Sequence, residues 1–574
     1  MRRFLLILTL LGGSGLISVA QQRAEGFGPF RTNFRLRSDL HWSTKGGLPN
    51  DFASRFHGNT YLDGSISNRY LRLDLGLEEM GQPLPGFEDN KGRGLSHLSL
   101  SGRYAGFDVR LGDYYTQFGS GMLLRAYRDE NLGIDNAMRG IYAGYTHSRW
   151  GGLRLLVGQP RRYFDRGFIP PFNEDKHLFF NRDRGWVYAG DYELDLARAL
   201  RLWEGKGRAL SLGASYVIKG EDEQSLSRTM ELDGKVGTYH IRQPRHVHGW
   251  SLRGHYTSGG LELMLEHAQK GQDPTEGNSY TYGTGMSTML TSTYTAGRMT
   301  MLLGLRRSEN FDFRAARREN GTALRLNHLL PFTQQQTYSL AALYPYATQP
   351  LGEWALQSEW RYRFLKNTLL GGKYGSSLRL GLSYVRGLDK SDKIIHGGVS
   401  MYGEDAPRSS YFGLGKLYFY DANIEYSRKI SKNYSFNLTY LHQAYNQEII
   451  EGHADYEPML YSHIFIYEGK HRLSRKVSLR TELQYLHSRE GERDWLYGMA
   501  EVTLLPGLVL SVSDQWNIGR TGRHYYLLSA TSTFGAHRVQ LSWGSTRAGI
   551  NCSGGVCRVV PETHGLNLSY AVTL

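Results

Sequence analysis

The sequence predicts an all-β protein: a transmembrane antiparallel up-and-down β-barrel of roughly 18 to 22 strands, with long loops on one side and short turns on the other. Three observations lead to this fold class. Apolar and polar residues alternate at every second position through most of the 574 residues. Short and long connections alternate along the chain, and the last segment with the two-residue period runs to the final residue.

The alternation has the period of two that is typical of strands with one apolar and one polar face. The segment "RYLRLDLGLE" places Leu71, Leu73 and Leu75 on one face, with charged residues and a glycine between them. The same pattern recurs to the end of the chain. It indicates about 22 strands between Ser65 and Leu574.

The connections between these segments fall into two kinds. Short ones include Ala105-Gly106 and Pro506-Gly507, and long ones include residues 113–138 and 308–352. Transmembrane barrels place short turns on the periplasmic side and long loops outside the cell. The alternative all-β folds, a secreted sandwich or propeller, give no reason for such an alternation.

The first twenty residues are typical of a signal peptide. A positive start is followed by the apolar run "FLLILTLL" and by the small residues Ser18, Val19 and Ala20, which predicts a signal peptide over residues 1–20. A single membrane anchor would need about 20 apolar residues, and glycines interrupt this run too early. Mean hydropathy is -0.46 and no long apolar run follows, so helical membrane spans are excluded.

The composition fits an exported barrel better than a nucleic-acid-binding protein. The net charge is +14, but the basic residues are dispersed rather than gathered in a tract. Anionic lipopolysaccharide at the outer rim and anionic solutes in the lumen are the alternatives to a merely solvated basic surface. The 39 tyrosines and 10 tryptophans are expected to line the two membrane interfaces as girdles.

One long segment does not alternate over its first two thirds. It is "GDYYTQFGSGMLLRAYRDENLGIDNAMRGIYAGY", which begins at Gly112. Its apolar groups need burial, and its mixed charges need one another or water. We therefore expect the inserted loop 112–140 to fold into the lumen as a constriction or plug, with Arg125, Arg128 and Arg139 facing Asp129, Glu130 and Asp135. The candidate residues of this constriction are Phe118, Gly119, Gly121, Arg125, Arg128, Asp129, Glu130, Asp135 and Arg139.

Two other long segments have aromatic and proline content that is unusual for a solvated loop. They cover residues 161–186 and 340–357, and the second contains Tyr344, Tyr346 and Glu353. Each segment either caps the outer rim or folds inward.

The only two cysteines are Cys552 and Cys557, in "GINCSGGVCRVVPE". The glycines between them permit a tight reversal, and the exported compartment is oxidising, so a disulfide is expected. Two thiols without a nearby pair of histidines give too few ligands for a metal site. We expect a disulfide between the two cysteines to close an extracellular loop.

No enzymatic constellation stands out. His97 and Ser99 share a strand face, an arrangement reminiscent of some outer-membrane lipid hydrolases, but no acidic residue can be named to orient the histidine. Acidic clusters at 221–223 and 273–276 lack the ligand spacing of a calcium loop. We expect no enzyme, no cofactor and no metal.

The mature chain resembles the large, porin-like outer-membrane barrels of Gram-negative bacteria. The final "HGLNLSYAVTL" is similar to their closing strand, apart from a terminal Leu574 where Phe is commonest, and "YYTQFGSGMLLRAYRDENLGIDNAMRG" and "RAGINCSGGVCRVVP" look like signatures of an uncharacterised family among them. The resemblance implies a multi-pass barrel in the outer membrane, inserted by the barrel assembly machinery. It implies no substrate.

The predicted organisation follows from these observations. Residues 21–64 are too few for the separate plug domain of TonB-dependent receptors, and "NFRLRSDLHW" within them forms either an extra strand or a partial occlusion of the lumen. The barrel itself is expected over residues 65–574. Its function is either that of a channel with an inward-folded constriction loop, or that of a non-conducting barrel serving a surface or secretion complex; a lipid-modifying enzyme ranks third. Outer-membrane lipid and lipopolysaccharide are the expected partners, and nucleic acid is not.

Overall fold

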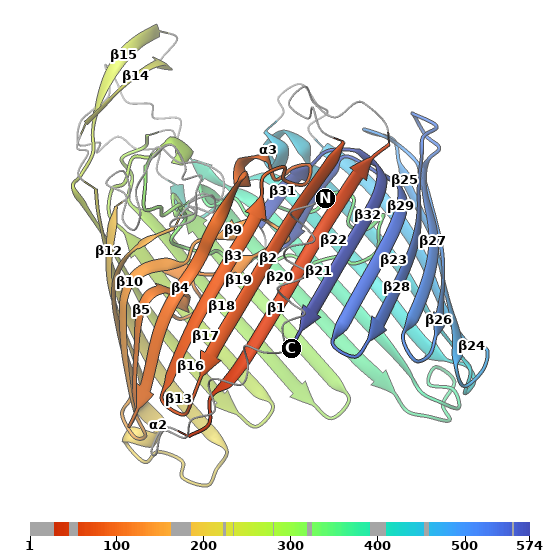
Figure 1. Ribbon diagram of the computed structural model, residues 1–574, viewed down its shortest axis with the longest axis horizontal. Coiled ribbons are helices and arrows are strands. Elements are labelled where there is room, and N and C mark those ends of the chain that lie inside the picture. Colours follow the sequence, from red (N-terminus) through yellow and green to blue (C-terminus); the bar gives the residue numbers. More distant parts are fainter. Residues whose placement is uncertain are drawn as a thin grey trace, which may run out of the picture.

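A closed, tilted barrel wall dominates the structure (Figure 1). The computed structural model describes residues 28–44, 55–161, 185–221, 225–232, 235–278, 280–317, 324–390, 409–452, 459–553 and 556–574. Within these ranges, 24 strands form a single sheet in which each strand pairs antiparallel with its neighbours along the chain. The sheet closes where β1 pairs with both β2 and β32, for example through Leu36 opposite Leu62 and Val572.

The wall strands run from one end of the barrel to the other. In chain order they are β1 (Arg31–Ser43), β2 (Phe56–Ser67), β3 (Leu71–Met80), β4 (Gly92–Tyr104), β5 (Phe107–Tyr114), β10 (Met138–His147), β11 (Gly151–Pro160), β12 (Trp186–Asp195), β13 (Arg208–Gly220), β16 (His246–Ser258), β17 (Leu261–Lys270), β18 (Gly285–Ala296), β19 (Met299–Glu309), β20 (Gly352–Phe364), β21 (Ser376–Lys390), β22 (Ser409–Lys429), β23 (Tyr434–Asn446), β24 (Met459–Arg472), β25 (Val477–Ser488), β26 (Trp495–Leu504), β27 (Leu508–Asn517), β28 (His524–Phe534), β29 (His537–Thr546) and β32 (Thr563–Thr573).

Smaller elements lie in the connections. They are β6 (Thr116–Gln117), β7 (Arg125–Ala126), β8 (Arg128–Asp129), β9 (Ile134–Asp135), β14 (Ser225–Leu232), β15 (Lys235–Arg242), β30 (Gly549–Ser553), β31 (Val556–Val560), the helices α2 (Leu196–Ala199) and α3 (Gln447–Glu451), and two single 3-10 turns at Glu88–Asn90 and Glu276–Asn278. No helix among the described residues is long and apolar enough to cross a membrane.

The predicted all-β up-and-down barrel is confirmed, but the predicted range of 18 to 22 strands is too low. The wall has 24 strands, and subtracting β1 and β2 leaves the 22 expected between Ser65 and Leu574. The two further strands come from the N-terminal segment, since residues 33–42 lie in β1 and the wall begins at Arg31 rather than at residue 65. Residues 33–42 were expected to form either an extra strand or an occlusion of the lumen, so the predicted count began at Ser65 and left out β1 and β2.

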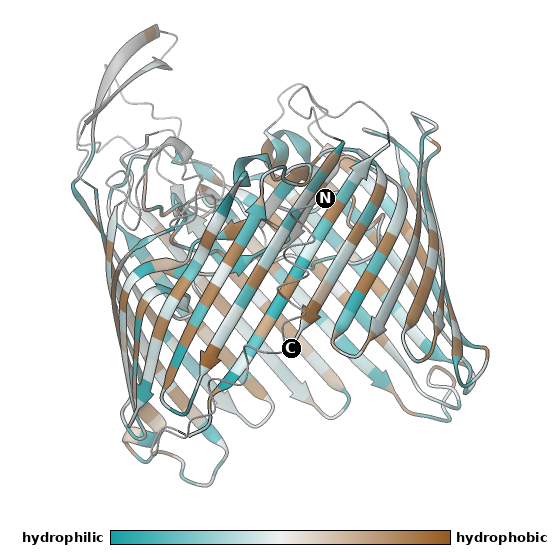
Figure 2. Cartoon of the chain, in the orientation of Figure 1, coloured by the Kyte–Doolittle hydropathy of each residue, from teal (hydrophilic) through white to brown (hydrophobic). Residues whose placement is uncertain are grey.

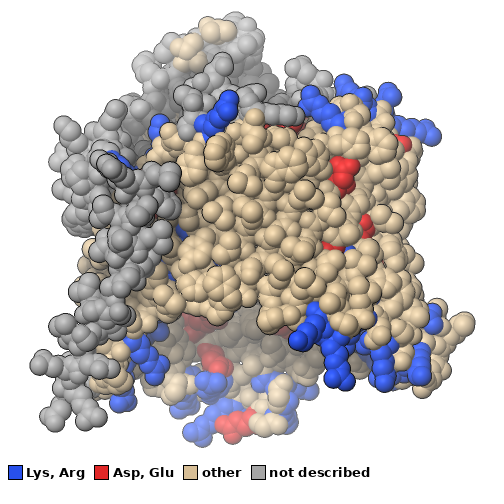
Figure 3. Space-filling view, turned by 45° about the vertical axis from the view of Figure 1, so that its right-hand side comes forward, with Lys and Arg blue, Asp and Glu red and all other residues tan. Residues whose placement is uncertain are grey.

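The outer face of the wall is apolar. On β3, for instance, Leu71, Leu73 and Leu75 are exposed outward, whereas Asp74 and Glu78 point inward to ion partners. Hydrophobic residues accordingly recur along the wall strands (Figure 2). The molecular surface has a mainly uncharged band between two rims where Lys and Arg gather (Figure 3). This is the surface that a barrel presents to lipid, since a closed sheet satisfies its own backbone groups.

The two ends of the barrel differ as the sequence predicts. One end carries short turns together with α2, whereas the other carries long connections, and the β14–β15 hairpin extends beyond its rim (Figure 1). The chain's last strand ends at the short-turn end. The predicted signal peptide 1–20 and most of the segment 161–186 lie outside the described residues.

The main hydrophobic core lies inside the barrel rather than between layers of sheet. Its buried cluster joins wall residues such as Val217 and Ile464 to loop residues such as Phe118, Phe313 and Tyr344. Large apolar side chains inside a lumen otherwise lined by charge require chain segments that fold inward to cover them. Two loops supply those segments.

Candidate functional site in the barrel lumen

Two long connections fold into the lumen from the end of the barrel that carries the long loops, which we call the wide-loop end. The first inner loop, residues 115–137, joins β5 to β10. The second inner loop lies between β19 and β20, and its described residues are 310–317 and 324–351. Most of their apolar side chains are buried: Phe118, Leu123, Leu124, Phe311 and Phe313 have no exposed surface.

Two glycines shape the start of the first inner loop. Gly119 and Gly121 have positive φ angles of 52° and 89°, a backbone region that L side chains rarely adopt. The amide of Gly121 donates to the carbonyl of Phe118 at 2.8 Å, and the amide of Phe118 donates to the carbonyl of Leu124 at 3.0 Å. The chain thereby turns back within a few residues. This tight reversal places Phe118 in the core.

Charged residues tie the first inner loop to the near wall, β1 to β3. Arg128 lies 2.7 Å from an Asp63 carboxylate oxygen and 3.5 Å from one of Glu78. Glu130 accepts from Arg35 at 2.8 Å and from Arg37 at 3.2 Å. Burial alone would lower the pKa of Arg128, but Asp63 and Glu78 raise it above its usual value. Arg128 therefore stays charged although it is buried against the wall.

A second ion-pair group lies at the end of the same loop. Asp135 pairs with Arg161, whose guanidinium also approaches Glu78 at 3.4 Å. Both side chains of the Asp135–Arg161 pair are only 1% exposed. The hydroxyl of Tyr115 donates to Asp135 at 3.1 Å, and burial raises the pKa of Tyr115 well above its usual range. The loop end is thus held by buried, charge-assisted contacts.

On the far side the first inner loop reaches β11, β16 and β17. The amide of Ser120 donates to Glu266 Oε2 at 2.9 Å. A Cβ added at Gly119 would meet Glu266 Oε1 at 2.8 Å and Arg253 Cδ at 2.9 Å. The Arg154 guanidinium lies over the Phe118 ring, 5.4 Å from its centroid. The loop therefore bridges two separate stretches of the wall.

The charge pairing expected within this loop holds for only one pair. Arg128 and Glu130 approach to 3.3 Å. Arg139 lies on β10 and binds Asp113 of β5 at 2.7 Å, and Arg125 stacks on Tyr127 at 4.3 Å. Asp129 accepts from the amides of the next turn, Asn131 and Leu132. The expected partners for Arg125 and Arg139 were wrong because an aromatic ring and a wall strand satisfy those arginines instead.

The second inner loop crosses to the opposite wall. Its contacts there lie on β22, β23, β24, β25 and β27, and all are hydrogen bonds that involve an amide or carboxylate side chain of the wall. They comprise Gln336 to Asp421 at 2.9 Å, Tyr338 to Glu468 at 2.8 Å, the Leu340 amide to Gln484 at 2.8 Å, Ser339 to Gln515 at 3.2 Å and Gln443 to the Tyr344 carbonyl at 3.2 Å. Of the two expectations for segment 340–357, the structure has the inward fold: Tyr344 and Tyr346 are 7% and 5% exposed.

The two inner loops contact one another inside the barrel. The amide of Arg125 donates to the Leu326 carbonyl at 2.7 Å, and the amide of His328 donates to the Gly121 carbonyl at 3.0 Å. Asn136 Nδ2 donates to the Arg325 carbonyl at 2.9 Å. Burial lowers the pKa of His328 to about 3, helped by the neighbouring arginines. The pair of loops is thus one hydrogen-bonded body anchored on both walls.

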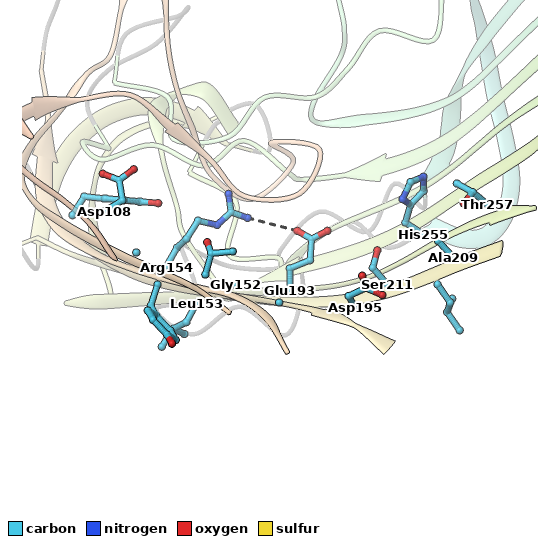
Figure 4. A pocket seen from close by; sticks show the side chains of 16 residues that line it. Asp108, Gly152, Leu153, Arg154, Glu193, Asp195, Ala209, Ser211, His255 and Thr257 are labelled. Carbon is cyan, nitrogen blue, oxygen red and sulfur yellow. Dashed lines mark ion pairs between the residues drawn. The ribbon is translucent and has the colours of Figure 1, made fainter. Parts of the chain in front are cut away.

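Recesses remain on the inner wall toward the short-turn end. One has a volume of about 500 Å³, and Asp108, Arg154, Glu193 and His255 rise into it from the wall strands (Figure 4). Arg154 and Glu193 lie 3.8 Å apart. A second recess of about 420 Å³ is lined by polar residues of β3 to β5. The first recess also has apolar lining residues, such as Leu153 and Leu210, whereas the second is lined mainly by polar side chains.

The two cysteines occupy the β30–β31 hairpin. The register places Cys552 opposite Cys557. Their side chains lie outside the described residues, so the disulfide stays a prediction. At the base of this hairpin Arg547 donates to the Leu343 carbonyl at 3.5 Å. The segment that leads into the hairpin therefore contacts the second inner loop.

The residues considered for catalysis and metal binding do not assemble a site in the described part of the chain. His97 stacks on Tyr115, with ring centroids 5.4 Å apart, and has no hydrogen bond to Ser99. Among the described residues no group of three or more His, Cys, Asp or Glu side chains is arranged to hold a metal ion.

The whole chain, residues 1–574, matches the model of a family described as "Family of unknown function (DUF6029)". The chain belongs to this family. With its closed wall and apolar outer band, this DUF6029 member is a multi-pass β-barrel protein of the outer membrane. No curated protein matches its sequence.

Several solved structures share part of the architecture. The siderophore receptor PirA from Pseudomonas aeruginosa is 10% identical, with 95% of this chain and 80% of that chain covered and a TM-score of 0.40. The P pilus usher PapC translocation pore is 9% identical, with coverage of 95% and 99% and a TM-score of 0.35. Acinetobacter baumannii OccAB3 is 10% identical, with coverage of 95% and 99% and a TM-score of 0.31. Such distant likenesses do not bear on the function of this DUF6029 member.

Sequence reasoning missed the second inner loop as the partner of the first. The signal was present in "NFDFRAA" from Asn310 and "LRLNHLLPF" from Leu324, which are rich in apolar residues although they lie within a long connection. It also missed Arg161 and Glu266, which bind the first loop. Those contacts join residues far apart in the chain, so spacing alone gives no sign of them.

Proposed function

We propose that the protein is a solute channel of the outer membrane, in which the two inner loops act together as a plug that narrows the lumen. The observation that carries this proposal is the pair of backbone hydrogen bonds between Arg125 and Leu326 and between His328 and Gly121, formed by loops that are anchored on different walls. Barrels of this size class enclose an aqueous channel or a plugged lumen.

The way each loop is anchored supports a plug rather than a surface cap. The first inner loop binds inward-facing charges of β1 to β3, and the second binds inward-facing side chains of β22 to β27. A loop that only covers the rim has no reason to bury Phe118 or Leu340, neither of which has any exposed surface. Solutes then pass along the part of the inner wall that the two loops do not cover.

Single-channel recording in planar bilayers tests the proposal. Deleting residues 116–136 removes the first inner loop and is expected to raise the conductance several-fold, because the second loop loses its partner. Deleting residues 225–242 removes a hairpin that extends beyond the rim, and is expected to change the conductance little. Heat-dependent gel mobility identifies the folded barrels. Folded wild type and folded deletion variant that both fail to conduct would refute the channel.

Outer-membrane lipid with its lipopolysaccharide and the barrel assembly machinery stay part of the proposal as partners. The Lys and Arg at the rims suit anionic lipopolysaccharide, and the barrel assembly machinery is the expected insertion partner (Figure 3). The alternative role, a non-conducting barrel in a surface or secretion complex, predicts stoichiometric co-purification with another protein in mild detergent. A conducting barrel that purifies alone removes that alternative.

A further inference from the structure

The two recesses of the inner wall differ in charge. The first is lined by Asp108, Glu193 and Asp195 against Arg154 (Figure 4). The second lies on β3, β4 and β5 and the turn at residues 68–70, and we call it the basic recess. Its lining arginines and aspartates are Arg69, Arg72, Arg103, Arg110, Asp74 and Asp113. Of the two recesses, the second therefore attracts an anion.

The basic recess lies between the first inner loop and the short turns. Its lining runs from Arg69, in the turn between β2 and β3, to Tyr115 at the start of the loop. The amide of Arg103 donates to the Tyr70 carbonyl at 2.7 Å, which holds that turn beside Arg103. At the other end, the ring of Tyr115 stacks on His97, with 5.4 Å between the centroids. In the proposed channel, a solute that has passed the plug reaches this recess before it leaves the barrel.

The floor of the basic recess places hydroxyl groups between arginines. Ser101 lies directly opposite Arg72 of β3 and opposite Arg110 of β5. Directly opposed residues on antiparallel strands have Cβ atoms about 4.5–5.5 Å apart, so one oxyanion is within reach of all three side chains. Ser99 also lines the recess, is 5% exposed and makes no hydrogen bond within the described part of the chain.

Most charges around the basic recess are already paired. Arg72 binds Asp74 at 2.7 Å, and Arg139 binds Asp113 at 2.7 Å. The carboxylates nearer the plug also have arginine partners, which are Arg128 for Asp63, Arg161 for Glu78 and Asp135, and Arg35 and Arg37 for Glu130. The charge of the recess is therefore set by its remaining arginines.

Those remaining arginines outnumber their carboxylates by two. Arg103 and Arg110 share Asp108, at 3.3 Å and 2.8 Å. Arg69 forms no ion pair within the described ranges. Arginine stays protonated at neutral pH, so the basic recess has an excess of two positive charges.

Arginine donors also remain unused. A guanidinium has five N–H groups in a planar fork. Asp74 accepts from Nε and Nη2 of Arg72, which leaves Nη1. Asp108 accepts from Nε and Nη2 of Arg110, and the Tyr115 carbonyl accepts from Nη1 at 3.1 Å. Both arginines line the recess, so their remaining N–H groups can bind an oxyanion there.

We infer that the basic recess binds the phosphate group of a small solute, such as a phosphate ester of a polyol. A phosphate ester carries about 1.5 to 2 negative charges at pH 7 and three strong acceptor oxygens, which match the excess charge and the cluster of donors. A carboxylate has one charge and two oxygens, so it matches less well. The volume of about 420 Å³ is within the usual range of small-molecule sites. This inference rests on the proposed function, in which solutes pass the plug and leave through this end.

Calorimetric titration of the folded barrel with glycerol phosphate, in a nonionic detergent at low salt, tests the inference. Glycerol phosphate is expected to bind about tenfold more tightly than acetate. The variant Arg69→Gln/Arg103→Gln removes the excess charge and is expected to weaken binding about tenfold. Ser101→Asp puts a carboxylate between Arg72 and Arg110, and is expected to abolish binding. Heat-dependent gel mobility identifies the folded variants.

A matched control removes two exposed arginines elsewhere on the inner wall. Arg361 and Arg363 of β20 alternate with Trp360 and Tyr362, which are exposed on the outer face. The variant Arg361→Gln/Arg363→Gln is expected to leave the affinity unchanged, because these residues do not line the basic recess. Equal weakening in the two double variants, or acetate bound as tightly as glycerol phosphate, would overturn the site.

The site and the channel can fail separately. A barrel that conducts but binds no glycerol phosphate, or a Ser101→Asp variant that binds it as wild type does, would overturn the site. A barrel that binds glycerol phosphate and never conducts would refute the channel and leave the site in place.

Discussion

The backbone amide of Arg125 donates to the carbonyl oxygen of Leu326 at 2.7 Å, and this bond joins two loops that arise from separate parts of the barrel wall. His328 and Gly121 form a second bond of the same kind at 3.0 Å. Each loop is also bound to the barrel wall. Because of the bonds between them, neither loop can leave the lumen without breaking its contact with the other. The plug is therefore expected to open as a unit.

The buried Asp135–Arg161 pair is expected to stabilise the folded barrel. Asp135→Asn removes the charge that faces a guanidinium with 1% exposure, at a cost of about 3 kcal/mol. The temperature at which the barrel unfolds in detergent, measured by heat-dependent gel mobility, should fall. The control Asp74→Asn breaks an exposed pair in which Arg72 is 55% exposed, and should cost less than about 1 kcal/mol. Equal losses in the two variants would contradict a special role for Asp135.

Gly119→Ala is expected to loosen the first inner loop. The new Cβ would lie 2.8 Å from Glu266 Oε1, and the φ angle of 52° disfavours alanine, so the packed loop should lose about 1–3 kcal/mol. We expect more frequent channel openings in planar bilayers. Gly64→Ala is the control, because nothing lies within 4 Å of a Cβ added there. Identical opening frequencies for wild type and Gly119→Ala would count against this packing.

Acid is expected to open the plug through His328. At pH 7 this histidine is neutral whether the loops are packed or released. Below about pH 6.5 a released histidine binds a proton, whereas burial and nearby arginines hold the packed pKa at about 3. Packing therefore loses stability as the pH falls from 6.5 toward 3.

Channel open probability should accordingly rise between pH 7.5 and about pH 5, and His328→Gln should remove that rise. Asp273 does not titrate in this window: burial raises its pKa, but Lys219 and other cations lower it to about 2. Its ion pair is lost only at lower pH. A pH response that survives in His328→Gln would assign the effect to another group.

Cys552 and Cys557 are expected to be joined in the exported protein. Their opposed positions in the β30–β31 register are compatible with a short ring, and the compartment is oxidising. Alkylation of denatured, unreduced protein should leave both cysteines unmodified, and reduction should expose two thiols by mass. Alkylation of both cysteines in protein that has not been reduced would show that no disulfide joins the two strands of the hairpin.

The wall was largely predictable because each strand repeats a local pattern. Leu71, Leu73 and Leu75 reveal their face through the two-residue period alone, and so do most other strands. β1 shows the same alternation, but one alternating segment ahead of the others does not distinguish a wall strand from a segment that occludes the lumen. Its pairing with both β2 and β32 places it in the wall.

The site was predictable only in part. The composition of the first loop indicated that Phe118 and its neighbours need burial, and Phe118 is indeed fully buried. The identity of each partner could not be predicted, since Arg139 binds Asp113 across a strand pair and Asp135 binds Arg161 across the loop end. Such contacts depend on register and on chain segments that are distant in sequence, which periodicity does not encode.

Cross-linking of Ser339 to Gln515 tests the central claim most directly. The side-chain oxygens of these residues lie 3.2 Å apart, one on the second inner loop and the other on the inner wall at β27. With the two natural cysteines replaced by serine, the variant Ser339→Cys/Gln515→Cys should form an intramolecular disulfide in intact outer membranes under mild oxidant. A shift in gel mobility that is reversed by reductant would report it. Absence of the cross-link, together with rapid labelling of Ser339→Cys by a bulky maleimide added to whole cells, would place the loop outside the lumen and contradict the plug.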